Sequence, residues 1–509
     1  MITRRSTLKT LTLVPLATGL SIGLRYPSLA QSENNRLRIP EQAFGNIDNN
    51  LRRFQLNLQR GTSEFLPDRQ TDTFGVNGNY LGPTLRFKRN QEIGLSVTNE
   101  LGEPTTLHWH GFHLPAIEDG GPHQLIENSD TRNSQFKVTQ FAGTFWYHSH
   151  ALHRSGEQVY KGLAGMIIVE DDEQGVDLPD NYGIDDIPLI VQDRRFNEDG
   201  SLDYMSRYED SVMGLQGDTI LVNGTLNAHF QASTRLVRFR ILNGSNARTY
   251  RFTFDDNRNF LQIGSDGSLL ESPVNLDQLE LAPAERAEIV VQFNPGESLK
   301  LLSIGRPSSF TEFPGAMSRM MRSLNAQNFD ILSLSADPQL DDNGEIPRQL
   351  TSISRLPESN ATNLRSFLLS MGAGMRSGGD RGPGTGMRNG LGGGYGGGNF
   401  TINGRRMEEN FINERIRLNT TEIWELNNNS PMMHPFHVHN GQFQVLDRNG
   451  NSPPANEMGW KDTVKVSSGE TVRIIMRFTD FSDETNPYMY HCHILEHEDR
   501  GMMGQFLVV

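Results

Sequence analysis

Ten of the fourteen histidines in the chain stand in four short groups with the spacing of metal ligands. The groups read HWH, HSH, HPFHVH and HCHILEH. Their members are His108, His110, His148, His150, His434, His437, His439, His491, His493 and His497. Imidazole nitrogen suits borderline metals such as copper. The first chemistry that this sequence indicates is therefore metal binding.

Each group contains a His-x-His pair. On a β-strand the side chains of residues i and i+2 point to the same face, so each pair directs two imidazoles into one space. Two pairs lie between residues 108 and 150, and two lie between residues 437 and 493. A single pair is more often an ordinary core or surface feature. Four pairs at repeated positions predict a shared pocket of eight imidazoles, which suits a cluster of copper ions.

The one cysteine of the chain, Cys492, lies between the first two histidines of HCHILEH. On a strand it faces away from both of them. His497 and Met502 follow five and ten residues later, and His434 is the unpaired histidine of HPFHVH. Two imidazoles, a thiolate and a thioether are the ligands of a blue-copper electron-transfer centre. The sequence thus predicts an electron-collecting copper at Cys492, joined by a short covalent path to the neighbouring cluster ligands.

The elements that must position these ligands are short strands. Runs such as RLVRFRILNGS and ERIRLNTTEIWELNNNS alternate apolar and polar residues and end in Asn-containing turns, which is typical of half-buried antiparallel strands. VNG or ING opens a unit at residues 76–78, 222–224 and 402–404, and an Asn-bearing turn follows each time. These turns contain Asn99, Asn243 and Asn427. The repeats predict an all-β chain of three related β-sandwich domains.

The histidine groups belong to the first and third units. WYHSHALHRSGEQVYKGLAGMIIVE in the first parallels MYHCHILEHEDRGMMGQFLVV in the third, with Ser149 at the place of Cys492. The second unit has no paired histidines, so we expect it to space the outer two. The predicted domains span residues 31–175, 176–340 and 341–509.

The first thirty residues have the build of an export signal. Arg4 and Arg5 precede a short apolar run, and PSLA offers small residues for cleavage before Gln31. The paired arginines predict a twin-arginine signal peptide over residues 1–30 and a periplasmic mature protein. The sequence has no other stretch apolar and long enough to span a bilayer. A formal net charge of −14 disfavours nucleic acid and anionic lipid as partners.

Residues 372–398 hold 14 glycines among 27 residues. Such a segment cannot bury enough apolar surface to offset its chain entropy, so we expect a mobile loop or tether. It is either a lid over a site or a tolerated insertion.

On the four histidine motifs the chain resembles the multicopper oxidases, in particular the bacterial three-domain branch of laccase-like enzymes and cuprous oxidases. The resemblance implies three cupredoxin-like Greek-key domains, four coppers per chain, and O₂ as the electron acceptor. The implied type 1 ligands are His434, Cys492, His497 and Met502. The implied type 2 ligands are His108 and His437. The implied ligands of the two type 3 coppers are His110, His148 and His493 for one, and His150, His439 and His491 for the other.

Two carboxylates match acidic positions that carry protons to the cluster in this family. They are Glu498, directly after His497, and Asp119, in EDGGP. Carboxylates are common proton carriers. The alternative is that both are ordinary loop residues.

The resemblance leaves the electron donor open. Cuprous oxidases of this branch have a substrate copper site built from two methionines and two aspartates. Here the methionine positions match Met371 and Met432, whereas the aspartate positions fall on Arg376 and Ser430. An arginine in place of a carboxylate disfavours Cu(I), because it repels a cation. The MSRMM segment at residues 317–321 is an alternative source of thioethers or a packed helix face.

We therefore expect a monomeric, laccase-like oxidase of phenols or aromatic amines. The alternative within the enzymes is a cuprous oxidase that protects the periplasm from copper. A more remote alternative is a copper-free structural role in cell division, known for relatives that have lost the ligands. The complete ligand set argues against that role.

Overall fold

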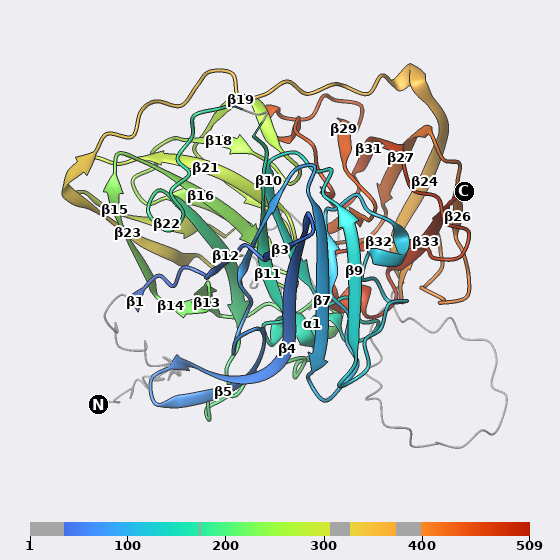
Figure 1. Cartoon of the computed structure of the whole chain (residues 1–509), viewed down its shortest axis with the longest axis horizontal. Coiled ribbons are helices and arrows are strands. Elements are labelled where there is room, and N and C mark those ends of the chain that lie inside the picture. Colours follow the sequence, from blue (N-terminus) through green and yellow to red (C-terminus); the bar gives the residue numbers. More distant parts are fainter. Residues whose placement is uncertain (1–34, 173–174, 306–325, 373–398) are drawn as a thin grey trace, which may run out of the picture.

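The computed structural model describes residues 35–172, 175–305, 326–372 and 399–509. Within them the chain forms six β-sheets that pair into three β-sandwiches (Figure 1). The all-β prediction is confirmed. The predicted signal peptide, the MSRMM segment and residues 373–398 of the Gly-rich segment lie outside the described residues.

The first sandwich pairs a sheet of order β2-β6-β11-β10-β8 with one of order β3-β4-β7-β9, and β5 pairs with β4. The bounds are β2 Gln42–Ala43, β3 Asn46–Asp48, β4 Leu51–Leu66, β5 Arg69–Val76, β6 Thr84–Lys88, β7 Glu92–Glu100, β8 His108–His110, β9 Thr131–Lys137, β10 Gly143–His148 and β11 Ala164–Glu170. In β4, Phe54, Leu56 and Leu58 are buried while the residues between them are exposed, as strand alternation requires.

The middle sandwich pairs a sheet of order β14-β13-β12-β16-β21-β18-β19 with one of order β1-β15-β23-β22-β17-β20. The bounds are β1 Asn35–Arg36, β12 Asp186–Arg194, β13 Thr219–Val222, β14 Thr225–Leu226, β15 Ala228–Thr234, β16 Leu236–Asn243, β17 Tyr250–Phe254, β18 Phe260–Gly264, β19 Leu269–Leu276, β20 Leu279–Leu281, β21 Arg286–Gln292, β22 Ser298–Ser303 and β23 Phe329–Asp341. The first described strand, β1, pairs in parallel with β15 and so extends the middle sandwich.

The third sandwich pairs a sheet of order β25-β24-β27-β31-β29 with one of order β26-β33-β32-β28-β30. The bounds are β24 Ala361–Gly372, β25 Asn399–Ile402, β26 Glu414–Ile416, β27 Thr420–Asn428, β28 His434–Val438, β29 Phe443–Arg448, β30 Thr463–Val466, β31 Thr471–Phe478, β32 Tyr488–Cys492 and β33 Met503–Val508. The order and directions of β26-β33-β32-β28 repeat those of β6-β11-β10-β8 in the first sandwich. This repetition explains why the HSH segment of the first unit and the HCH segment of the third are similar in sequence.

Short helices and turns connect the strands. They are α1 Ser155–Tyr160, α2 Tyr208–Met213, α4 Leu495–Glu498 and the 3₁₀ turns η1 Ala116–Glu118, η2 Glu358–Asn360 and η3 Ala455–Glu457. The carboxylate of Asp499, just after α4, accepts hydrogen bonds from the backbone N–H groups of Ser155 and Gly156 in α1. This contact joins the first and third sandwiches beside the histidine motifs. Among the described helices, none is long and apolar enough to cross a membrane.

Candidate metal centres

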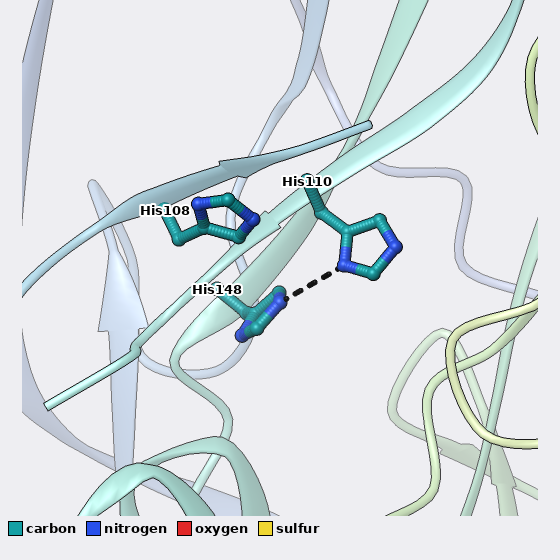
Figure 2. A group of neighbouring side chains, drawn as sticks. All are labelled: His108, His110 and His148. Carbon is teal, nitrogen blue, oxygen red and sulfur yellow. Dashed lines mark hydrogen bonds between the residues drawn. The ribbon is translucent and has the colours of Figure 1, made fainter. Parts of the chain in front are cut away.

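Two pairs of neighbouring strands position the His-x-His motifs. On the first sandwich, His148 at the end of β10 lies opposite His108 on β8. On the third, His491 on β32 lies opposite His437 on β28. Figure 2 shows the side chains of His108, His110 and His148 gathered on one side of their strands. The common facing of residues i and i+2 is what the spacing predicts.

The two sets of histidines interleave across the boundary between the first and third sandwiches. The ring centroids of His110 and His437 are 3.7 Å apart, and those of His108 and His439 are 4.0 Å apart. We term the following eight residues the histidine cluster. They are His108, His110, His148, His150, His437, His439, His491 and His493.

Several cluster imidazoles are anchored at one nitrogen and leave the other without a partner. Nδ1 of His108 donates to the Asp119 carbonyl at 2.8 Å, and Nδ1 of His437 donates to the Asp462 carbonyl at 2.7 Å. Nε2 of both rings is buried without a hydrogen-bond partner among the described residues. An unpaired buried nitrogen is costly, and a bound cation removes that cost. These nitrogens fit a metal.

Burial keeps the imidazoles neutral. It lowers the pKa of nine of the ten grouped histidines, and in most of them the neighbouring rings lower the pKa further by repelling a second positive charge. The pKa falls to about 3 for His148 and His434 and to about 4 for His150. Neutral imidazole is the form that binds metals.

Asp119 and Glu498 both contact cluster histidines. Nδ1 of His439 donates to Asp119 Oδ2 at 2.6 Å, and the Glu498 oxygens lie 3.4 Å from His150 Nδ1 and 3.1 Å from His491 Nδ1. Burial raises the pKa of Asp119 well above its ordinary value. Burial also opposes ionisation of Glu498, but attraction to His150 and His491 outweighs it and lowers the pKa of Glu498. The pKa values of the two carboxyl groups are therefore shifted in opposite directions.

Cys492 lies in a second group of donors, here termed the thiolate pocket and made of His434, Cys492 and His497. Cys492 Sγ is 3.3 Å from Nδ1 of His434 and 3.7 Å from Nδ1 of His497. The outer nitrogens meet neutral groups: Nε2 of His434 donates to the Ser430 hydroxyl at 2.7 Å, and Nε2 of His497 donates to the Val212 carbonyl at 3.2 Å. All three donors are buried.

Cys492 faces away from its sequence neighbours, as strand alternation predicts. While its Sγ lies in the thiolate pocket, Nε2 of His491 is 3.1 Å from Nε2 of His150 in the histidine cluster. Burial raises the pKa of the Cys492 thiol, and a coordinating cation reverses this because it favours the thiolate. Met502 is buried in the same apolar core and accepts the Cys492 N–H at its carbonyl. Its role as a metal ligand stays a prediction.

Two of the predicted ligand sets coincide with groups of close donor atoms. In each group the donor atoms lie within 4.8 Å of one another. One group is the thiolate pocket, the predicted type 1 site. The other is His150, His439 and His491, the set predicted for one type 3 copper.

The other two predicted sets are spread over one larger group. His110 and His148 lie together with His108, with Nδ1 of His110 3.4 Å from Nε2 of His148 (Figure 2). The predicted third ligand, His493, has its ring centroid 5.1 Å from that of His110 and 5.2 Å from that of His148. The centroids of the predicted type 2 ligands His108 and His437 are 5.9 Å apart. The division of these five rings between two coppers stays a prediction.

Sequence analysis missed Asp462. Its carboxylate lies 3.0 Å from Nε2 of His110, and with His110 and His437 it forms a further group of close donor atoms. It stands alone in the stretch KDTV, which has no ligand-like spacing.

The comparisons with known proteins agree with this geometry. Sequence models of multicopper oxidases match residues 57–174, 188–298 and 387–509. Over 479 residues the chain is 33% identical to the multicopper oxidase mco of Staphylococcus haemolyticus, a match that covers 93% of this chain and 92% of that protein. The chain belongs to the multicopper oxidase family.

Two further proteins of similar sequence bear on the role of this multicopper oxidase. The crystal structure of a laccase from Pediococcus acidilactici matches it with a TM-score of 0.79 and 34% identity over 94% of each chain. The cell division protein FtsP of Photorhabdus laumondii is 32% identical over 467 residues, 89% of each chain. The cupredoxin-like fold and the enzyme class are confirmed: the chain is a copper-dependent oxidoreductase that uses O₂ as acceptor.

Proposed function

We propose that this multicopper oxidase is a laccase-like enzyme that takes single electrons from phenols and aromatic amines and reduces O₂ to water. Electrons enter at the thiolate pocket and reach O₂ at the histidine cluster. Four coppers per chain serve the reaction. The thiolate pocket and Met502 would hold a type 1 copper, and the histidine cluster would hold one type 2 and two type 3 coppers.

Copper bound at these residues supplies the redox chemistry, with one electron per ion and four electrons for the reduction of O₂ to two waters. The protein supplies ligand positions, insulation from water and protons. The ligand positions are supported by the buried, unpartnered Nε2 atoms of His108, His437 and His493. Insulation is supported by the burial of every cluster histidine, none more than 2% exposed.

Cys492 connects the two centres through its own backbone. Its Sγ lies in the thiolate pocket, and single peptide bonds lead from it to His491 and His493 in the histidine cluster. Pairing of Cys492 with Phe436 and of His491 with His437 fixes this segment against β28. A rigid covalent path of this length supports electron transfer from pocket to cluster.

Asp119 and Glu498 suit the transfer of protons. Burial raises the pKa of Asp119, and its Oδ1 has no hydrogen-bond partner among the described residues, whereas attraction to His150 and His491 lowers the pKa of Glu498. Two carboxyl groups with opposite pKa shifts divide into a proton donor and a proton acceptor. Their burial and their contacts with the cluster favour this relay over a role as ordinary loop residues.

The proposal of an organic electron donor rests on the environment of His434. Because Nδ1 of His434 faces Cys492, Nε2 bears the proton and donates to Ser430 Oγ, which in turn donates to the Met432 carbonyl at 2.8 Å. The Ser430 hydroxyl is neutral, and it both accepts and donates a hydrogen bond. It replaces one aspartate expected at a substrate site for Cu(I), so it favours an uncharged organic donor.

A cuprous oxidase is the second candidate, because one observation favours it. Met371 packs against the apolar core that contains Met432, so both expected thioethers belong to the core region of the third sandwich. Arg376, at the other aspartate position, lies outside the described residues.

A structural role in cell division, which the name of FtsP gives to that relative, is the remote alternative. A chain without copper has no need of eleven buried donors in two compact groups. We also propose export through the twin-arginine route to the periplasm, supported by Arg4 and Arg5 before the apolar run, and action as a monomer.

Oxygen uptake by the copper-loaded enzyme tests the proposal, with Cu(I) or a dimethoxyphenol as the sole donor. The phenol assay is run with and without added Cu(II). A laccase oxidises the phenol rapidly without added copper. Preference for Cu(I), with phenol oxidation that depends on added Cu(II), would instead establish the cuprous oxidase and point to Met371 and Met432.

A further inference from the structure

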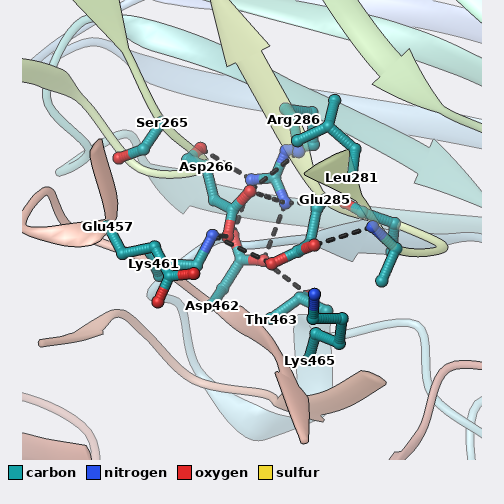
Figure 3. Close-up of polar contacts among 12 residues, drawn as sticks. Ser265, Asp266, Leu281, Glu285, Arg286, Glu457, Lys461, Asp462, Thr463 and Lys465 are labelled. Atoms are coloured by element: carbon teal, nitrogen blue, oxygen red, sulfur yellow. Dashed lines mark hydrogen bonds and ion pairs between the residues drawn. The ribbon is translucent and has the colours of Figure 1, made fainter. Parts of the chain in front are cut away.

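A buried cluster of charged residues joins the middle and third sandwiches (Figure 3), and its member Asp462 contacts His110 of the histidine cluster. Arg286, Asp266 and Glu285 belong to the middle sandwich, and Lys461 and Asp462 to the third. All five are buried, with Arg286 and Asp462 at 1% and 0% exposure. Lys461 Nζ pairs with Asp266 at 2.8 Å and Glu285 at 3.2 Å. We term these residues the Arg286 cluster.

His110 is the histidine that donates a hydrogen bond to a side chain of this cluster. In His108, His148, His437 and His439, Nδ1 donates to a protein oxygen, which leaves Nε2 for a metal. His110 is reversed: Nδ1 faces Nε2 of His148 at 3.4 Å, and Nε2 points to Asp462 Oδ1 at 3.0 Å. Its proton must therefore be on Nε2, where a carboxylate accepts it.

Asp462 supports ligands of both sandwiches. Its side chain accepts from Nε2 of His110, and its backbone carbonyl accepts from Nδ1 of His437 at 2.7 Å. The two imidazoles stack with an interplanar angle of 12°. A small rotation of Asp462 would therefore move one ring against the other.

Arg286 fixes the Asp462 carboxylate. Its Nη1 donates to Oδ1 at 2.7 Å and its Nη2 to Oδ2 at 2.6 Å, a bidentate geometry that sets the plane of the carboxylate. The other three N–H groups donate to the carbonyls of Thr144, Ala284 and Asp266. All five donors of the guanidinium are used, so its position is determined by three segments of backbone.

Gly111, next to His110, makes room for this contact. Its φ is +87°, and a Cβ there would lie 2.4 Å from Asp462 Oδ2 and 3.1 Å from Arg286 Nη2. A glycine at this position therefore leaves room for the Arg286–Asp462 ion pair next to the strand that carries His110.

We propose that Arg286 is a positioning residue which, through Asp462, sets the tautomer and ring orientation of His110. By this route the middle sandwich helps to build the oxygen-reducing site, although its one histidine, His229, takes no part in it. The inference rests on the copper cluster of the proposed function. Hydrogen-bond partners of metal-ligating histidines are worth about 10- to 100-fold in metal affinity or activity.

The test compares Arg286→Met, Arg286→Lys and Asp462→Asn with Arg240→Met as a matched control. Arg240 is buried in the same sandwich, pairs with Asp186 and Glu288, and reaches the side chain of Thr144 in the first sandwich. It has the same kind of interdomain contact without a link to a copper ligand. The readouts are copper bound per chain, copper affinity by chelator competition, the blue absorption of the thiolate-bound copper, and thermal unfolding.

We expect Arg286→Met and Asp462→Asn to lose copper from the histidine cluster, with affinity about 10- to 100-fold weaker, and to keep the blue absorption. Arg286→Lys should fall between them and the parent, because an ammonium restores the charge without the bidentate geometry. Arg240→Met should lower the unfolding temperature but keep all the copper.

Full copper affinity in Arg286→Met would overturn the inference, and so would an equal copper loss in Arg240→Met. Loss in Asp462→Asn alone would also overturn it, since Asp462 would then act without Arg286. These readouts do not depend on the donor that is oxidised. Failure of the parent enzyme to oxidise phenols would therefore count against the proposed function and not against the role of Arg286.

Discussion

The thiolate pocket and the histidine cluster meet at adjacent residues of β32, Cys492 and His491, yet their surroundings differ. The outer nitrogens of the thiolate pocket meet a hydroxyl, Ser430, and a backbone carbonyl, Val212. The ligands of the histidine cluster meet three carboxyl groups, Asp119, Asp462 and Glu498. Both regions are fully buried, so exposure is not the difference.

The difference follows from whether each region transfers electrons alone or electrons together with protons. A centre that only passes electrons needs no proton partner, and neutral neighbours keep its charge changes small. A centre that reduces O₂ to water consumes protons, so ionisable groups beside its ligands are useful there. Carboxyl groups thus serve both to supply protons and to orient ligands in the histidine cluster. Burying their charge costs free energy of folding.

The largest effect is expected for Cys492→Ser. A hydroxyl is a poor copper ligand beside two imidazoles, so the electron entry point is lost. Oxidation of organic donors should fall by about 10⁴-fold, as when one member of a catalytic triad is removed. Blue absorption and steady-state oxygen uptake measure the two losses.

Ser149 offers the matched control, because it holds the equivalent position in the first sandwich. Its hydroxyl donates to Gln158 and is buried. Ser149→Ala should cost about 1 kcal/mol of stability and leave activity intact. Activity that survives in Cys492→Ser would refute the entry of electrons at Cys492.

The second effect is expected for Glu498→Gln. The amide keeps the shape of the side chain but cannot accept a proton, so turnover should fall by about 100-fold while donors still bleach the blue absorption. Glu496→Gln is the control on the same helix. Glu496 is a buried carboxyl that accepts from Asn246 and the Leu215 N–H, so its hydrogen bonds go to the middle sandwich and not to the histidine cluster. Equal losses in both variants would assign the effect to burial of α4 and not to proton transfer.

The comparison also separates what sequence could predict from what it could not. The His-x-His spacing and the alternation at Cys492 are local, so they indicated the two centres and the direction in which each ligand points. The three strand-rich units could also be predicted from the sequence, because each repeats the same turn signals.

The carboxyl groups that contact the copper-ligating histidines could be predicted from the sequence only in part. Glu498 adjoins His497 and could be matched to a motif, whereas Asp462 contacts His110 across 352 residues and Arg286 across 176 residues. Such contacts have no period or spacing that a single sequence could display. The pairing of β1 with β15 in the middle sandwich was missed for the same reason.

The third prediction adds to the thiolate pocket the charge that it lacks. Ser430→Asp places a carboxylate at Nε2 of His434 and should raise the ratio of Cu(I) to phenol oxidation by about tenfold, which is about 1.4 kcal/mol of attraction for the cation. Ser430→Ala removes the hydroxyl without adding charge and should change both rates alike. Oxygen uptake with each donor gives the ratio. An unchanged ratio in Ser430→Asp would show that this position does not select the donor.

The smallest effect concerns a property that the two regions share. The folded-state pKa of His148 and His434 is about 3, below the ordinary value of 6.5. Below pH 6.5 the unfolded chain therefore binds protons that the folded chain excludes, and stability falls with falling pH. Nine histidines act in this direction. Five buried carboxyl groups with raised pKa oppose them, so the net sign is set by the histidines.

Each neutral histidine contributes about 1.4 kcal/mol per pH unit between about pH 5 and 6. In the copper-free protein, His148→Gln and His434→Gln should each reduce the pH dependence of the unfolding free energy by that amount. Urea unfolding with a chelator present, at several pH values in this window, measures the slope. Equal reductions would show that both imidazoles stay neutral in the folded protein across this window, although burial alone lowers the pKa of His434 while neighbouring rings also lower that of His148. A smaller reduction for either variant would mean that the folded-state pKa of that histidine lies inside the window and not below it.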